Sequence, residues 1–324
     1  MPRPQRIEYN GAWYHVVNRR EGRRPLFRTN EHYEFFLDLL GDVSETYSVE
    51  FHAYCLTDSV FHLIVHTPYG NLSTAMRHLN SVYTQFYNRE RNTGGSIFRD
   101  RYKAVLLDKE NFLTKVSRYI HFVPVILKLA NRPEQYPWSS FCAYIGKAKS
   151  PAWLHKQDIL GFFSKRNAAK QYEAFVKSGV DEQTLAFYGK KSLSSIFGEK
   201  RFVTDAKRLR QGKRPSAHLQ RGEKTIPKPK LNVILQATAN KFSVDRKTLN
   251  QEMRGRGGGN TARAVAMLLA RNPGGYSLNE IAESLKVGDI STVSVAVKRM
   301  KTRLTTEPTL AKKVDSLKNE LFIK

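Results

Sequence analysis

The chain has 324 residues, 40% of them hydrophobic and 26% charged, which is the composition of an ordinary globular protein. No apolar run reaches the roughly 18 residues that a membrane helix needs, and the start of the chain is basic and polar, so we expect a cytoplasmic protein with neither a signal peptide nor a membrane partner. The net charge is +25, from 54 Lys and Arg against 29 Asp and Glu, and this excess favours nucleic acid as the partner.

The two cysteines, Cys55 and Cys142, show no metal-ligand spacing and are expected to be reduced.

The basic excess is uneven along the chain. Residues 1–150 carry 20 basic and 14 acidic side chains, whereas residues 151–324 carry 34 and 15. Residues 201–230 alone hold ten basic and two acidic residues, with three prolines and too few apolar residues for a core. This pattern predicts an exposed basic linker, either a solubilising tether or a segment that contacts phosphates.

The hydrophobic periodicity before the linker predicts a regular order of elements. Strands are expected at Ala12–Asn18, Val49–Leu56, Phe61–Thr67 and Tyr102–Leu107, and helices after Asn30, after Leu72 and from Lys109 to near Pro124. The order β-α-β-β-α-β, with one helix added, predicts a ferredoxin-like, split βαβ antiparallel sheet within an α+β protein. We assign this domain to residues 1–146 and a small helical region to residues 147–200.

After the linker, the apolar spacing predicts an all-α domain over residues 231–305 and a helical tail over residues 306–324. One helix is expected to be capped by Asn260, and a shorter one to begin at the capping-box pair Ser277 and Glu280. A glycine-containing turn at residues 286–288 and a further helix follow, which is the helix-turn-helix pattern.

The last of these helices buries Val293, Val297 and Met300 and leaves polar residues towards solvent. Small hydroxyl side chains allow a recognition helix to approach the major groove closely, and basic side chains further along reach phosphates. The expected DNA-contacting residues are Ser291, Thr292, Ser294, Lys298 and Arg299.

Five ordered segments before the linker, GAWYHVVNR, AYCLTDSVFHLIVHTP, FRDRYKAVLLD, SRYIHFVPV and YPWSSFCAY, resemble the IS200-like tyrosine transposases, in particular the REP-associated branch. The resemblance covers roughly residues 5–146. It implies a single-strand DNA nuclease and strand transferase of the HUH class, in which a tyrosine attacks a phosphodiester and stays linked to the 5′ phosphate. It also implies Mg²⁺ or Mn²⁺, held by two histidines of one strand and a polar residue on the tyrosine's helix.

The resemblance assigns the nucleophile to Tyr119, which we expect to have a partly exposed edge because Ser117, Arg118 and His121 surround it. The second histidine of the His-hydrophobic-His motif is His62. Valines stand at the other two expected ligand positions, Val60 and Val123, and cannot bind a metal.

Either the metal site is impaired and cleavage is lost, or it is rewired and cleavage survives. His15, on a strand that could be adjacent, and Asp58 are candidate replacement ligands. His66 is excluded, since four residues along an extended strand place it roughly 13 Å from His62.

Basic side chains add candidate phosphate contacts at two places. Arg99, Arg101 and Lys103 alternate along one predicted strand and would line one face with positive charge. Arg254 and Arg256 lie in the glycine-rich loop before Asn260.

The segment ARAVAMLLARNPGGYSLNEIAESLKVGDISTVSVAVKRM resembles the C-terminal DNA-binding domain of the DnaA replication initiators, a Trp-repressor-like helical fold. The resemblance covers roughly residues 231–305 and implies DNA contact by Arg263 and the segment 289–293. Where that family has histidine and threonine early in the recognition helix, this chain has Ile290, Ser291 and Thr292, so the base sequence read can differ.

Three functions follow from these observations. The first is a transposase-family enzyme acting through Tyr119. The second is a non-catalytic, sequence-specific DNA-binding or regulatory protein derived from such an enzyme, and the third is an RNA-binding protein. We expect sequence-specific DNA binding, with single-stranded or hairpin DNA at the N-terminal domain and duplex DNA at the C-terminal domain. Transposases of this family dimerise, so a homodimer is a further expectation.

Overall fold

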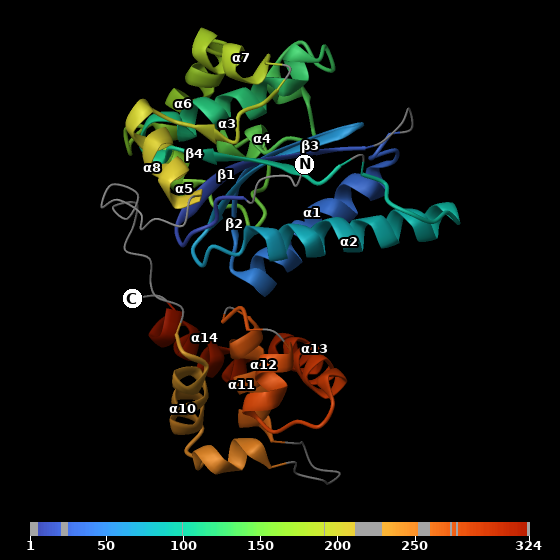
Figure 1. Cartoon of the computed structure of the whole chain (residues 1–324), viewed down its shortest axis with the longest axis vertical. Coiled ribbons are helices and arrows are strands. Elements are labelled where there is room, and N and C mark those ends of the chain that lie inside the picture. The colour runs from blue at the N-terminus through green and yellow to red at the C-terminus, as the bar shows by residue number, and fades with distance from the viewer. Residues whose placement is uncertain are drawn as a thin grey trace. The chain divides into compact units, whose positions relative to one another are not determined.

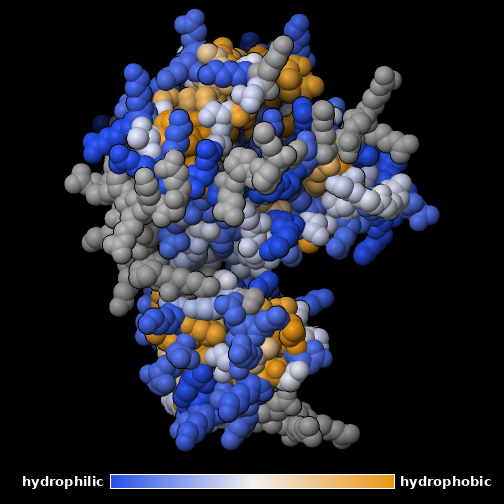
Figure 2. All heavy atoms as spheres, in the orientation of Figure 1, coloured by the Kyte–Doolittle hydropathy of each residue, from blue (hydrophilic) through white to orange (hydrophobic). Residues whose placement is uncertain are grey.

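The computed structural model describes residues 6–20, 25–98, 100–190, 192–210, 229–251, 260–272, 274–276 and 278–322. They form two compact units, one within residues 1–44 and 49–225 and the other within residues 226–324 together with 45–48. Hydrophilic residues cover most of the visible face of each unit (Figure 2). Among the described helices, none is long and apolar enough to cross a membrane.

The first unit is built on a five-stranded sheet in the order β2-β3-β1-β4-β5. The strands are β1 (Ala12–Arg19), β2 (Glu50–Thr57), β3 (Val60–Thr67), β4 (Lys103–Leu107) and β5 (Ile196–Phe197). The central strand β1 pairs antiparallel with both β3 and β4, and β2 pairs antiparallel with β3. The predicted α+β class is confirmed, and the first four strands lie close to their predicted bounds.

Helices cover both faces of this sheet (Figure 1). α1 (Asn30–Tyr47) and α2 (Leu72–Arg91) pack on one face, where the ring centroids of Phe36 and Phe61 lie 5.0 Å apart. α3 (Lys109–Ile126) lies on the other face. Because side chains alternate along a strand, residues 61, 63 and 65 of β3 face α1 and α2, and residues 62, 64 and 66 face α3.

The prediction of a purely antiparallel sheet is wrong in one respect, because β5 pairs parallel with β4. Its two residues, Ile196 and Phe197, are buried. The rings of Phe187 and Phe197 stack at 4.0 Å, so burial of these aromatic groups holds the short strand at the sheet edge.

The described residues between 128 and 210 belong to the first unit. They contain a 3₁₀ turn (Pro133–Gln135), α4 (Phe141–Tyr144), α5 (Gln157–Leu160), α6 (Ala168–Lys177), α7 (Glu182–Tyr188) and α8 (Lys200–Arg210). Helix α8 buries Phe202 and Ala206, so the expectation of an exposed linker from residue 201 does not hold for its first ten residues. The remainder of the predicted linker, residues 211–228, lies outside the described residues.

Helix α3 continues two residues past Pro124, where the sequence predicts its end. A proline removes one backbone N–H but keeps a helical φ, so a helix can pass it when the next amides find acceptors. Here the Leu127 amide donates to the Val123 carbonyl and the Leu129 amide to the Pro124 carbonyl.

The second unit is entirely helical in its described residues. It contains α10 (Leu231–Lys241), a 3₁₀ turn (Arg246–Asn250), α11 (Thr261–Arg271), α12 (Leu278–Ser284), α13 (Ile290–Thr306) and α14 (Pro308–Phe322). Asn260 caps α11 as predicted, its side chain accepting from the Arg263 amide at 2.9 Å. The predicted capping residue Ser277 lies outside the described residues.

Helix α14 contributes to the core of the second unit, although the sequence predicts only a tail there. Leu310, Val314, Leu317 and Phe322 are buried in the same apolar cluster as α10, α11 and α13. The spacing of these four residues places them on one face of a helix, which explains why the helix packs rather than extends into solvent.

We predict that Leu317→Ala lowers the free energy of unfolding of the second unit by about 2–5 kcal/mol, because it leaves a cavity in a closed core. Asn319→Ala, on the exposed face of the same helix, should change it by less than about 0.5 kcal/mol. Urea unfolding of the full chain measures both effects, and equal stabilities of the two variants would contradict the packing of α14.

Candidate functional site

The sheet register brings two histidines together on the face that α3 covers. Val17 of β1 is the partner of His62 on β3, and His15 is the partner of Ile64, so His15 and His62 are diagonal neighbours. His15 Nε2 lies 3.2 Å from His62 Nδ1, within hydrogen-bonding distance. The expectation that the His15 strand lies beside the His62 strand is therefore confirmed.

Tyr119 on α3 lies over this histidine pair. Its ring centroid is 6.2 Å from that of His15 and 6.2 Å from that of His62, with edge-to-face geometry in both cases. The side chain is partly exposed, as predicted. The structure therefore brings together Tyr119 and His62, the two residues that the resemblance assigns to chemistry.

The polar neighbours that suggested this exposure are themselves buried. Ser117 and His121 both contact the Tyr172 hydroxyl, at 3.0 and 2.7 Å, and Arg118 forms an ion pair with Asp181 at 2.6 Å. These side chains attach α6 and α7 to α3 and do not line a solvent-facing edge.

The sequence gives no indication of the fourth member of the site, Tyr188 at the end of α7. Its ring stacks on Tyr119 with centroids 4.1 Å apart and an interplanar angle of 9°. Its hydroxyl lies 2.7 Å from His15 Nδ1. Tyr188 therefore covers one face of the candidate nucleophile and anchors the histidine pair.

Burial keeps both imidazoles neutral. It lowers the pKa of His62 to about 4 and that of His15 well below the ordinary value, the latter also through the neighbouring His62. Burial likewise raises the pKa of Tyr119, with a smaller contribution from Cys55. At neutral pH the site thus contains neutral imidazoles beside a protonated phenol.

The residues at the expected metal position do not fit a divalent ion. Val60 and Val123 offer no donor atom, and His62 Nδ1 is engaged by His15. A single imidazole is a poor site for Mg²⁺ or Mn²⁺, which prefer several oxygen ligands.

Positive charge lies beside this site, although not in the predicted arrangement. Strand β4 begins at Lys103, so Arg101 precedes the strand and does not alternate with Lys103 along it; both side chains are exposed. Lys103 is the partner of Val17, which places it on the same sheet face as His15 and His62. Arg99 lies outside the described residues.

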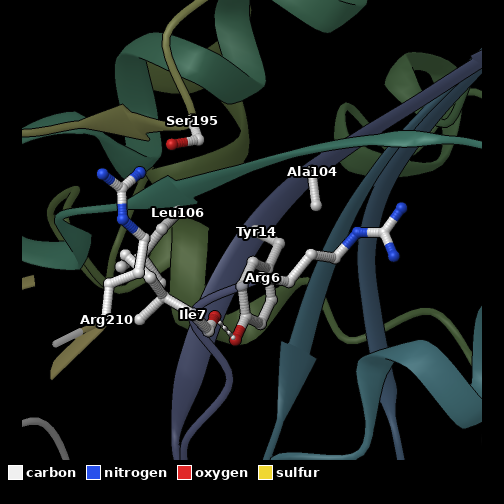
Figure 3. Close-up of a pocket in the computed structure, with 7 residues that line it drawn as sticks. All are labelled: Arg6, Ile7, Tyr14, Ala104, Leu106, Ser195 and Arg210. Carbon is white, nitrogen blue, oxygen red and sulfur yellow. Dashed lines mark hydrogen bonds between the residues drawn. The ribbon is translucent and has the colours of Figure 1, made fainter. Parts of the chain in front are cut away.

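A second basic feature lies on the opposite face of the sheet, in a pocket lined by Arg6, Ile7, Tyr14, Ala104, Leu106, Ser195 and Arg210 (Figure 3). The Tyr14 hydroxyl donates to the Ile7 carbonyl at 2.8 Å, and one Arg6 nitrogen donates to the Tyr102 carbonyl at 2.7 Å. The Arg6 and Arg210 guanidinium groups point to opposite sides (Figure 3), and that of Arg6 lies over the Tyr102 ring at 3.7 Å, so the pocket does not bring the two charges together.

In the second unit, α13 presents the predicted contact residues on one surface. Ser291, Thr292, Ser294, Lys298 and Arg299 are all exposed, and Val293, Val297 and Met300 are buried behind them. Asp289 caps the helix by accepting from the Ser291 amide at 2.8 Å. Five side chains expected to contact DNA are thus free of the core.

Arg263 differs from these residues. It is only 6% exposed, because α11 is the central helix of the unit and Ala262, Val265 and Ala266 pack beside it. The Arg263 side chain is therefore buried in this structure, and its contact with DNA stays a prediction. Arg254 and Arg256 lie outside the described residues.

Part of the chain matches a known protein family. The family described as "Transposase IS200 like" matches residues 8–122. This match supports a relationship of that segment to the IS200-like transposases. The IS200-like segment contains His15, His62 and Tyr119 but ends before Tyr188.

One solved structure with similarity is described as "Structure of the REP associates tyrosine transposase bound to a REP hairpin". It is 18% identical, with a TM-score of 0.40, and the match covers 48% of this chain and 92% of that chain. No curated protein matches this chain.

We predict that the stability of the first unit falls as pH drops from 6.5 to about 4. In this window the unfolded chain binds protons at His62 and His15 that the folded chain does not, so unfolding is favoured. In His62→Leu the pH dependence should be shallower by up to about 1.4 kcal/mol per pH unit. Urea unfolding at pH 5, 6 and 7 measures the slope, and identical slopes for both proteins would refute the assignment.

Proposed function

We propose that this chain is a DNA-binding relative of the IS200-like transposases that does not cleave DNA through Tyr119. The observation that carries the proposal is the composition of the site. The IS200-like segment holds Tyr119 over His62, while valines occupy the two other metal-ligand positions.

The surroundings of Tyr119 also oppose its action as a nucleophile. Attack on a phosphodiester requires an ionised or base-activated phenol with room for an incoming phosphate. Burial raises the Tyr119 pKa, and the Tyr188 ring stacks on the phenol at 4.1 Å. The Tyr188 ring therefore closes one face of Tyr119 to an incoming phosphate, and its hydroxyl contact with His15 holds it there.

Binding of a nucleic acid strand without cleavage fits the charges better. Lys103 and Arg101 are exposed, and Lys103 shares the sheet face of the site. Phosphate contacts from such side chains need no metal. Together with the strand order β2-β3-β1-β4, which fits a ferredoxin-like fold, these features support single-stranded or hairpin DNA as the ligand of the first unit.

We propose duplex DNA as the ligand of the second unit. α12 and α13 have the order and spacing of a helix-turn-helix, and α13 exposes three hydroxyl side chains followed by Lys298 and Arg299. A Trp-repressor-like fold and a regulatory role through sequence-specific binding are part of this proposal, as is a homodimer.

A second candidate function is residual cleavage by a rewired site, and one observation favours it. His15 Nε2 and His62 Nδ1 are 3.2 Å apart, close enough to contact a common ligand. In that case His15 would replace the histidine that is absent at position 60.

Incubation of the full chain with 3′-labelled hairpin DNA and Mn²⁺ separates the two candidates, because the label then stays on the strand that a tyrosine-5′-phosphate adduct retains. We predict DNA binding without a covalent adduct, because the site has neither the metal ligands nor an activated phenol. An adduct that disappears in Tyr119→Phe would establish residual cleavage and refute the non-cleaving assignment.

For the second unit, we predict that the double variant Lys298→Ala, Arg299→Ala weakens duplex binding and lowers the salt slope of log K by about 2, since two phosphate contacts are lost. Lys312→Ala, an exposed residue of α14, should leave both quantities unchanged. Equal salt slopes for the double variant and the unmodified chain would rule out α13 as the contact helix.

A further inference from the structure

A second cluster of ligating side chains lies at the other end of the histidine-bearing sheet face. Glu50 opens β2 and is the strand partner of His66 near the end of β3. Glu50 Oε2 lies 2.7 Å from His66 Nδ1 and 3.6 Å from His52 Nε2. The ligand atoms of these three residues all lie within 4.8 Å of one another.

A β-bulge directs His52 into this cluster. Phe51 pairs with Val65 and Ala53 with Ile64, so His52 is an extra residue on β2. The His52 ring lies 4.3 Å from the Trp13 ring, and Trp13 in turn stacks on His66 at 4.5 Å and 18°. Since Trp13 and His66 are strand partners, the indole fixes both imidazoles on the α3 side of the sheet.

The environment of His52 lacks a suitable partner for one of its nitrogens. The side chain is fully buried, and neither ring nitrogen has a hydrogen-bond partner among the described residues. Nε2 faces the Glu50 carboxylate and Nδ1 faces that of Asp158, each at 3.6 Å. A neutral imidazole carries one N–H, so one nitrogen must direct its lone pair at a carboxylate that only accepts hydrogen bonds.

A second proton on His52 or a bound cation would resolve this conflict. The geometry favours the cation, because Glu50 Oε2 lies 2.7 Å from His66 Nδ1 and 3.6 Å from His52 Nε2. A cation between Glu50 and the two imidazoles would meet one anionic oxygen and two nitrogen lone pairs.

We propose that Glu50, His52 and His66 bind a zinc ion. Two imidazole nitrogens and one carboxylate oxygen form a donor set suited to Zn²⁺, with a fourth position left for water or another ligand. Tetrahedral bonds of about 2.0–2.1 Å place ligand atoms roughly 3.3 Å apart, and the separations of 2.7 and 3.6 Å bracket that value.

The surroundings supply the outer contacts that zinc histidines require. Asp158 faces His52 Nδ1, opposite the nitrogen that would bind zinc, and would orient the ring. Lys109 holds Asp158 at 3.4 Å. The Glu50 side chain is 32% exposed, which gives the ion a path from solvent. The proposed zinc would join β2 and β3, and α5 would contact the site through Asp158.

This site is separate from the one at Tyr119. His66 and His62 are four residues apart, roughly 13 Å along an extended strand, so one ion cannot contact both. The proposed zinc therefore has no contact with Tyr119, and the proposal goes beyond DNA binding.

The test is a Zn²⁺ titration of the metal-free full chain in competition with a chromophoric chelator. We expect one zinc per chain at this site and a rise in melting temperature on binding. Asp158→Asn should weaken binding by about 10- to 100-fold, and Glu50→Gln and His66→Gln by more than that. The control His78→Ala, on α2 across the sheet, should bind zinc as the unmodified chain does.

Three results would overturn the proposal: no zinc bound, unchanged affinity in Glu50→Gln and His66→Gln, or loss of zinc in His62→Ala with these two variants intact. Glu50→Gln and His66→Gln conserve most of the side-chain volume, and circular dichroism verifies that they fold.

Discussion

Buried imidazoles constrain the first unit more than any other feature. His15, His52, His62 and His121 are each at most 9% exposed, in positions where most proteins bury apolar side chains. A buried polar group without a partner costs about 1–3 kcal/mol, so hydrogen-bond partners for His15 and His121 stabilise the first unit. Tyrosines from the later helices provide them: Tyr188 contacts His15, and Tyr172 contacts His121. Helices α6 and α7 thus supply partners to two buried histidines of the IS200-like segment.

The same contacts restrict what the site can do. The hydroxyl of Tyr188 satisfies His15, and this places its ring against Tyr119. A residue that stabilises the fold thus also covers the candidate nucleophile. In the proposed function, the valines at positions 60 and 123 and the Tyr188 ring are two separate features that each oppose cleavage at Tyr119.

Most of what could be predicted about the fold came from the local hydrophobic periodicity of the sequence. Two-residue alternation located β1 to β4, and helical stripes located α1, α2, α3 and the helices of the second unit, because each of these elements buries one continuous face. Strand β5 has only two residues and no periodicity, so its parallel pairing could not be foreseen. Helix α3 passes Pro124 because later amides find acceptors, a detail that propensity does not encode.

The site was predictable only where its residues are close in sequence or share a motif. Tyr119 and His62 were found in this way. Tyr188 lies 173 residues from His15 and is one aromatic residue among many, so only the folded arrangement identifies it. A one-residue bulge directs His52 towards Glu50, and the central position of α11 buries Arg263; neither effect leaves a mark in the sequence.

The central claim is that the first unit binds DNA without cleaving it, because metal ligands are absent at positions 60 and 123 and Tyr188 covers Tyr119. The most direct test restores the ligands and removes the cover. The triple variant Val60→His, Val123→Asn, Tyr188→Ala supplies both missing ligands and removes the cover from Tyr119. With Mn²⁺ and 3′-labelled hairpin DNA, the account predicts a covalent adduct that depends on Tyr119. A folded triple variant that binds the hairpin as tightly as the unmodified chain and still forms no adduct would contradict it.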